Sequence, residues 1–349
     1  MPVPSLYKGK YRDKNDDFER IFEAANNALV QGKIKERFYG IFIDEVQIFK
    51  PEWYRFCFNL LKSKNADDHF FIIAGDKSQD IKNNIKHGKA PWQGGGDTYP
   101  EYRGKTLPIE INYRNSKPIN DTIDNYVSAA KAMGAKLGVD LTSDQELFLR
   151  GTAFRNGNHP VLLELDDFSN EGEAKAICDS IKKLKKNNDI SDVDIAIVLY
   201  NESAPFTSKG WKTHNYKLEP YIRQYFYKEK WTDPVILKFG QSEGATYGSR
   251  RGVSIISIEG SLGLDFRAIV LAGLRPLGTH ENARAMSDFL NPNPDQQEGF
   301  KKNVNFLYTA CTRAKDELII ILSDQKGENL YMDLLRESMR LESKNEDIR

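Results

Sequence analysis

The stretch YGIFIDEVQ, residues 39–47, decides the fold that we expect for this chain. Its apolar run from Tyr39 to Ile43 leads directly into the acidic pair Asp44 and Glu45. A short apolar run that ends in polar residues is typical of a buried strand of a parallel sheet, with a functional loop at the strand's carboxyl end.

The neighbouring segments predict the same architecture. Apolar residues recur with a helical period over residues 16–31 and from Trp53 to Leu61, and a second short apolar run extends from Phe70 to Ala74. Helices alternating with buried strands predict an α/β fold with a parallel sheet. Residues 86–105 are rich in glycine and polar residues, and we interpret them as a long loop or a domain boundary.

A second α/β unit is expected from residue 109 onward. We predict helices after Pro118 and over residues 171–184, 218–227 and 306–313, and strands over residues 161–165, 193–200, 253–258, 268–272 and 318–322. We interpret residues 275–303 as a polar, proline-containing excursion. The chain is therefore divided into a first domain over residues 1–108, a second over residues 109–326, and a charged helix over residues 327–349.

The composition limits the classes of function. The chain has 349 residues, of which 40% are hydrophobic, and is long enough for two globular domains. Lys and Arg total 50, as do Asp and Glu, so any nucleic-acid contact must come from a local patch and not from net charge. Cys57, Cys178 and Cys311 are expected to be reduced. No segment is apolar enough to cross a membrane, so we expect a cytoplasmic protein without a membrane partner.

The acidic pair suits a magnesium nucleotide. Asp44 would hold Mg²⁺, directly or through water, and Glu45 would take a proton from an attacking water. Gln47 would orient that water or sense the terminal phosphate. The structural alternative is an acidic pair that caps the positive end of the following helix.

One glutamine and two arginines are further candidates for contacts with phosphate. Gln79 follows the second predicted strand, where Gly75 permits a tight turn. Arg114 follows Tyr113 at the start of the second unit, and Arg313 lies on a predicted helix. An arginine that reaches a nucleotide neutralises charge on the transferred phosphoryl group, and a neighbouring aromatic ring stacks on a base. Taken singly, each residue is more simply explained by an ordinary turn or a solvated surface.

Two glycine-containing segments remain. In SIEGSLGLDF, residues 257–266, backbone N–H groups around Gly263 would contact phosphate, and Asp265 would accept a hydrogen bond from a ribose hydroxyl. Taken alone, this segment is an ordinary connection between strands. In RGKT, residues 103–106, the last three residues match the end of a phosphate-binding loop. That loop requires glycine where Tyr99 stands and a preceding strand, so we reject the second match.

Taken together, five segments resemble the UvrD/Rep-like branch of the superfamily-1 helicases. The matching pieces are IFIDEVQ at 41–47, AGDKSQDI at 74–81, INYRNSKPI at 111–119, ISIEGSLGLDF at 256–266 and FLYTACTRAKDEL at 306–318. The resemblance covers about residues 36–323 and gains its specificity from the order of the pieces.

The resemblance implies two RecA-like parallel-sheet domains that bind ATP between them and move along single-stranded DNA or RNA. The residues that match the family's motifs are Asp44 for Mg²⁺; Glu45, Gln47, Arg114 and Arg313 for catalysis; Gln79, Tyr113, Gly263 and Asp265 for the nucleotide; and Ser257 for nucleic acid. In the family pattern, Glu45 is the catalytic base, Tyr113 stacks on adenine, and the two arginines contact the γ-phosphate.

The chain also departs from the family. The family's phosphate-binding loop lies further upstream than the 43 residues that precede Asp44, so we expect a first domain truncated at its N-terminal half. Glu259 and Leu262 stand where the family has a His and a Lys, and the DNA-stacking aromatics after Gln79 are replaced. Residues 235–252 are too few for the family's accessory insertion.

We therefore expect the carboxyl-terminal motor portion of a superfamily-1 helicase or translocase, with ATP and Mg²⁺ as cofactors. The phosphate-binding loop makes a principal electrostatic contribution to binding the phosphates of ATP. The chain alone is therefore expected to hydrolyse little ATP, and another polypeptide would supply that loop. Two alternatives remain open. One is a non-catalytic or split-subunit regulatory protein that keeps the helicase fold, and the other is a nucleic-acid-binding module without a nucleotide.

Overall fold

The computed structural model describes residues 14–63, 65–80, 107, 109–141, 148, 151–187, 190–200, 218–237, 252–278, 289 and 291–346. The chain separates into two compact units, of which the first comprises Met1–Gly75 and Asn84–Thr106 and the second Asp76–Asn83 and Leu107–Arg349. The chain thus passes from the first unit to the second directly after Gly75. The glycine-rich segment 86–105 and the rejected match at 103–106 lie outside the described residues.

The first unit contains a pair of parallel strands and two helices within its described part. Strand β1 (Gly40–Ile43) pairs with β2 (Phe70–Ile73), with Gly40 opposite Phe70. Helix α1 (Lys14–Val30) precedes the first strand, and α2 (Pro51–Asn59) begins with a proline in its first turn, where the missing N–H has no helical partner. These elements confirm the predicted ones to within a residue or two.

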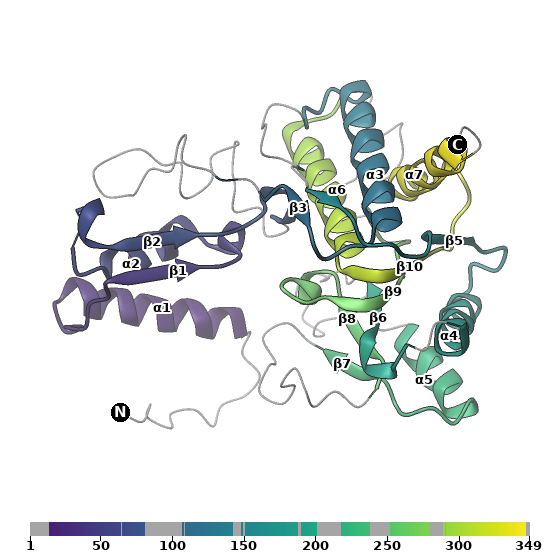
Figure 1. Cartoon of the computed structure of the whole chain (residues 1–349), viewed down its shortest axis with the longest axis horizontal. Coiled ribbons are helices and arrows are strands. Elements are labelled where there is room, and N and C mark those ends of the chain that lie inside the picture. The colour runs from purple at the N-terminus through teal and green to yellow at the C-terminus, as the bar shows by residue number, and fades with distance from the viewer. Residues whose placement is uncertain are drawn as a thin grey trace. The chain divides into compact units, whose positions relative to one another are not determined.

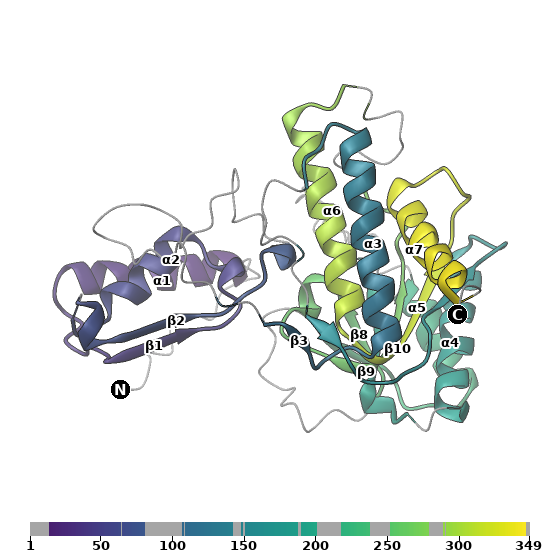
Figure 2. The same cartoon turned by 45° about the horizontal axis from the view of Figure 1, so that its top comes forward.

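One face of the β1–β2 pair is covered by helices. Figure 2 shows α1 and α2 on one side of these strands. Tyr54 and Phe58 of α2 lie edge-on against Phe71 of β2, with ring centroids 5.4 and 5.5 Å apart. On the other face, the alternation of side chains along a strand leaves Phe42 and Phe70 exposed by 73% and 69%.

The second unit is built on a six-stranded parallel sheet with the order β5-β10-β9-β6-β8-β7. The strands are β5 (Val161–Glu164), β6 (Ile195–Leu199), β7 (Val235–Leu237), β8 (Ser254–Ser257), β9 (Phe266–Ala272) and β10 (Ala314–Leu322). Every residue of β6 is buried, as expected for a central strand of a parallel sheet. The predicted α/β class with a parallel sheet is confirmed.

Helices cover both faces of this sheet (Figure 1). On one face lie α3 (Lys117–Lys136), α6 (Pro294–Thr312) and α7 (Leu330–Glu346); on the other lie α4 (Asn170–Asn187) and α5 (Leu218–Lys228). Alternate residues of β6 enter opposite cores, with Ala196 and Val198 in the first and Ile195 and Ile197 in the second. No helix in the described part of the chain is both long and apolar enough to span a bilayer.

The structure corrects two predictions. The expected excursion over 275–303 is wrong at its end, because α6 begins at Pro294, where Asn293 and Gln296 form a capping box. The sequence analysis also missed β7 and two short strands, β3 (Ile111–Asn112) and β4 (Thr152–Ala153), which form a separate parallel pair. Strands of two or three residues are too short to show a hydrophobic period.

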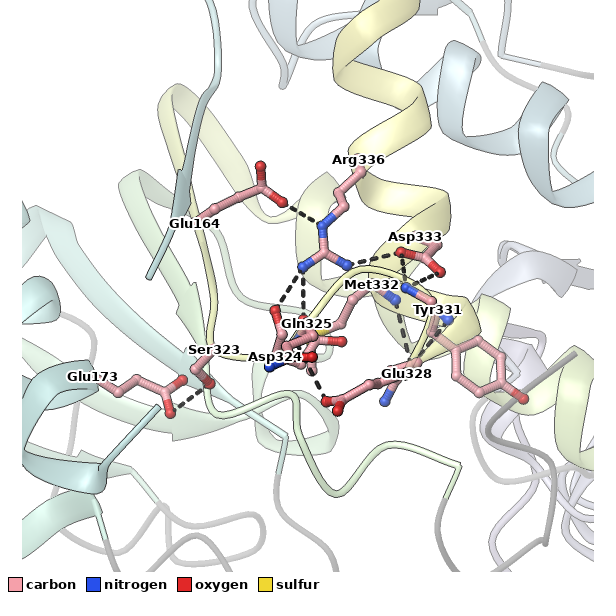
Figure 3. A network of polar contacts seen from close by, with 12 residues as sticks. Glu164, Glu173, Ser323, Asp324, Gln325, Glu328, Tyr331, Met332, Asp333 and Arg336 are labelled. Atoms are coloured by element: carbon pink, nitrogen blue, oxygen red, sulfur yellow. Dashed lines mark hydrogen bonds and ion pairs between the residues drawn. The ribbon is translucent and has the colours of Figure 1, made fainter. Parts of the chain in front are cut away.

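Helix α7 is fixed to the sheet by a buried arginine (Figure 3). The side chain of Arg336 is 3% exposed and donates to Asp324 and Asp333 at 2.8 Å each, and to Glu164 at the end of β5. Burial raises the pKa of Asp324, and the hydrogen bond from Arg336 opposes that shift. The terminal helix is therefore an integral part of the second unit.

A second buried carboxylate joins α4 to the ends of β9 and β10. Glu173 accepts hydrogen bonds from the N–H of Gly273 at 2.8 Å and from Ser323 Oγ at 2.9 Å, the latter visible in Figure 3. Burial raises the pKa of Glu173, while these hydrogen bonds and the charge of Arg275 lower it in part.

Candidate functional site

The acidic turn lies at the carboxyl ends of the strands in the first unit. Val46 N–H donates to the carbonyl of Ala74 at 3.0 Å, and Ala74 N–H donates to the carbonyl of Ile43 at 2.8 Å. The turn that follows β1 is therefore hydrogen-bonded to the end of β2. This is the edge where parallel sheets place functional loops.

Within this turn the three predicted residues are linked to one another. Gln47 is fully buried, and its Nε2 donates to Glu45 Oε2 at 2.5 Å. The N–H of Glu45 donates to Asp44 Oδ1 at 2.8 Å, and Asp44 is exposed. No group of three or more His, Cys, Asp or Glu able to hold a metal occurs among the described residues. Mg²⁺ at Asp44 would therefore take its other ligands from phosphate and water, as is usual for this ion.

The backbone of Glu45 is strained. Its φ of 52° and ψ of 43° lie in the left-handed region, which residues other than glycine rarely adopt. Strain of this kind gathers at functional sites, where the surrounding structure enforces it. The carboxylate of Glu45 makes no capping hydrogen bond to the 3-10 turn Val46–Ile48, so the helix-capping alternative lacks its expected contact.

Gly75 is required for space and not for an unusual φ. A Cβ atom at this position would collide with Gln47 Oε1 and lie 2.9 Å from Val46 Cγ1. Gly75 is not among the positive-φ residues, so the need for glycine here comes from the space beside Gln47 and Val46 and not from its φ. Its role is to let the end of β2 approach the buried amide of Gln47.

In the second unit, Arg313 and Gln79 form a buried hydrogen-bonded pair. Arg313 ends α6 and is fully buried, and its Nη2 donates to Gln79 Oε1 at 2.7 Å. The same guanidinium donates to the carbonyls of Thr309 at 3.2 Å and Leu264 at 3.4 Å. The structure thus brings together two predicted site residues that are 234 positions apart.

The segment that carries Gln79 is held against α6 by further polar contacts. Gln79 Nε2 donates to Asp76 Oδ2 at 2.9 Å, and Tyr308 Oη donates to the same oxygen at 3.2 Å. Ser78 Oγ accepts a hydrogen bond from the N–H of Phe148. The sequence analysis missed Tyr308 because nothing in a helical period distinguishes a tyrosine that binds an aspartate from one in the core.

Tyr113 and Arg114 lie on a turn that is fixed to the end of α6. Asn115 is 2% exposed, and its amide donates to the carbonyls on either side of Arg313, those of Thr312 at 3.2 Å and Ala314 at 2.6 Å. Tyr113 is 75% exposed. The Arg114 side chain is half-buried, and no hydrogen bond or ion pair of its guanidinium occurs within the described residues. Asn115 was not predicted, because its burial is visible only in the structure; its place directly after Arg114 is the one signal that the sequence offers.

The loop before β9 contains the remaining predicted residues. Gly263 adopts a left-handed φ of 70°, and Asp265 forms an ion pair with Lys315 at 2.7 Å. Ser257 Oγ accepts a hydrogen bond from the N–H of Gly260 at 3.0 Å. Since Phe266 of β9 is in register with Ala314 of β10, Asp265 and Arg313 both lie at the amino ends of these strands.

Comparisons with known proteins add little. No family model matches the chain, and no curated protein matches it. Among solved structures, it is similar to the C-terminal domain of a possible DNA helicase from Lactobacillus plantarum WCFS1, with 14% identity and a TM-score of 0.35 over 65% of this chain and 96% of that one. This similarity is too low to support a conclusion about function.

Proposed function

We propose that the chain is the carboxyl-terminal motor portion of a UvrD/Rep-like superfamily-1 helicase or translocase. It would couple ATP hydrolysis to movement along single-stranded DNA or RNA. The single observation that carries the proposal is the buried hydrogen bond between Gln79 and Arg313.

The physical support lies in how this pair is built. A charged guanidinium that donates to a neutral amide forms a strong hydrogen bond, and the additional carbonyl contacts hold Arg313 in one geometry. A donor that is positioned in advance needs no reorganisation when charge develops on a phosphoryl group. Gln79 is also linked to Tyr308 of α6 through Asp76, so a movement of Gln79 would alter hydrogen bonds to that helix.

The proposal assigns complementary chemistry to the first unit. Asp44 is exposed and free to approach a magnesium nucleotide, and Glu45 is held in a strained conformation by the turn around it. Gln47 positions the Glu45 carboxylate by a hydrogen bond. In this scheme Asp44 would hold Mg²⁺ and Glu45 would accept a proton from the attacking water, while Arg114 of the second unit would neutralise charge on the γ-phosphate.

A second candidate is a regulatory or split subunit that keeps the helicase fold and depends on a partner for the phosphate-binding loop. The pattern of such a loop is absent from the printed sequence. The ion pair between Asp265 and Lys315 favours this candidate, because the carboxylate assigned to the ribose already has a protein partner.

Nucleotide binding by the full chain tests the proposal. Titration calorimetry should show weak binding of ATP that requires Mg²⁺. Asp44→Ala should remove the Mg²⁺ requirement and Arg114→Ala should weaken binding, while Arg223→Ala on α5 serves as a matched control. Phosphate release with single-stranded DNA should not exceed that of Glu45→Gln.

Two results would count against this reading. If ATP with Mg²⁺ fails to bind even at millimolar concentration, the motor proposal is wrong. If the chain alone turns over ATP and Glu45→Gln abolishes that turnover, the motor stands, but the dependence on an external phosphate-binding loop is wrong.

A further inference from the structure

A second exposed aromatic residue lies beside Tyr113. Tyr113 is 75% exposed and Phe154 is 70% exposed, although 41 positions separate them in the sequence (154 − 113). In the β3–β4 pair, Ile111 lies opposite Thr152 and Asn112 opposite Ala153. One further residue of this register would bring Tyr113 beside Phe154.

The two segments continue side by side beyond the paired residues. Lys117 N–H donates to the carbonyl of Arg155 at 2.7 Å. A Cβ atom on Gly157 would collide with the side chain of Ser116, so the backbones are close there as well. Contacts before and after Tyr113 and Phe154 therefore keep the two segments close together.

The opposite face of this strand pair explains why the rings point outward. Ala153 is 3% exposed, and the Asn112 amide donates to Asn115 at 2.9 Å and to Asn120 at 2.8 Å. Because successive side chains of a strand point to opposite faces, the face that holds the half-buried Asn112 and the buried Ala153 lies opposite the face of Tyr113 and Phe154. Two exposed rings on one face are more informative than a single one, because contiguous apolar surface is found at interaction sites.

The charges beside the rings point to the kind of ligand. The Arg155 guanidinium donates to the carbonyl of Lys315 at 2.8 Å and forms an ion pair with Asp316. Arg114, by contrast, has no such side-chain contact within the described residues. Two aromatic faces next to an available guanidinium suit a ligand that combines a flat ring system with phosphate.

We propose that Phe154 is a second base-stacking residue. Together with Tyr113 it forms a platform for the base of a nucleotide, and Arg114 contacts a phosphate of that nucleotide. This inference rests on the proposed function and adds to it a residue outside the five matched segments. Neighbouring strands are about 4.8 Å apart, so both rings are within reach of one base. The base belongs either to ATP or to a single-stranded nucleic acid.

Substitution of the ring tests the platform. Phe154→Leu keeps an apolar side chain at an exposed position, and Tyr227→Leu, at a residue that is 84% exposed on α5, is the matched control. Calorimetry would compare ATP with inorganic tripolyphosphate, and fluorescence anisotropy would follow a labelled single-stranded oligonucleotide. Loss of one stacking ring should weaken binding about five- to tenfold. The control should change nothing.

The outcomes separate the inference from the proposed function. Weaker binding of ATP or of the oligonucleotide, with tripolyphosphate unaffected, supports base stacking and identifies the source of the base. If Phe154→Leu leaves ATP and oligonucleotide binding at wild-type strength, or weakens tripolyphosphate equally, the platform is wrong and the proposed function stands. If the wild-type chain binds neither ATP nor the oligonucleotide, both are wrong.

Discussion

The two units solve the same packing problem to different degrees. The sheet of the second unit has helices on both faces, and its central strand β6 is fully buried. The β1–β2 pair of the first unit has its core on one face, while Phe42 and Phe70 remain exposed on the other. Parallel sheets are normally covered on both faces, so the second unit is complete in a way that the described part of the first is not.

The candidate site residues of the two units also differ in how far they are buried. In the first unit, Asp44 is exposed and Glu45 is strained at the carboxyl ends of the strands. In the second, Arg313 is buried and multiply hydrogen-bonded at the amino end of β10. The carboxylates of Asp44 and Glu45 therefore lie on the unit with the smaller core, and the guanidinium of Arg313 lies in the unit with the larger one.

The largest expected effect concerns the second unit. Arg336→Ala leaves the buried carboxylate of Asp324 without its partner, which should cost about 4 kcal/mol in the free energy of unfolding. Hydrogen exchange of β5 and β10 peptides measures the loss. Lys182→Ala, which removes an exposed ion pair with Glu229, should change it by less than about 0.5 kcal/mol. If Arg336→Ala left the free energy of unfolding unchanged, the contact between α7 and the sheet would not stabilise this unit.

A somewhat smaller effect is expected from adjacent residues in the first unit. Phe71→Ala removes a buried ring and should cost about 3 kcal/mol, measured as faster hydrogen exchange in β1 and α2. Phe70→Ala, on the open face, should change the free energy of unfolding derived from hydrogen exchange by less than about 0.5 kcal/mol. Equal costs at both positions would mean that the outer face of β2 is covered after all.

The smallest effect is a dependence on pH. Burial raises the pKa of Glu173 above its ordinary value of 4.5, so the folded protein keeps this proton to higher pH than the unfolded chain does. The associated stability is fully present below pH 4.5 and is lost as pH rises through the raised value. As pH rises, the urea midpoint of unfolding should fall less in Glu173→Gln than in the wild-type chain. Glu171→Gln, at an exposed residue of the same helix, should follow the wild-type profile. Parallel pH profiles for both variants would contradict the assignment.

Sequence patterns predicted the long helices and strands better than the contacts between distant residues. The apolar runs 195–199 of β6 and 268–272 of β9 identified these strands, because burial on both faces leaves no polar position within them. The strand pair β3–β4 was too short to show a period, and Phe154 was missed with it. The pairing of Gln79 with Arg313 also required the structure, because two sites far apart in sequence show no common pattern.

The amide of Gln79 has two chemically different ends, and both are used. Its oxygen accepts from Arg313 and its nitrogen donates to Asp76. Glutamate at this position would repel the aspartate, and leucine would satisfy neither neighbour. In a chain descended from the same ancestor, glutamine here with aspartate three residues earlier would therefore indicate an arginine held in the same way, whereas loss of the amide would indicate that this link has been abandoned.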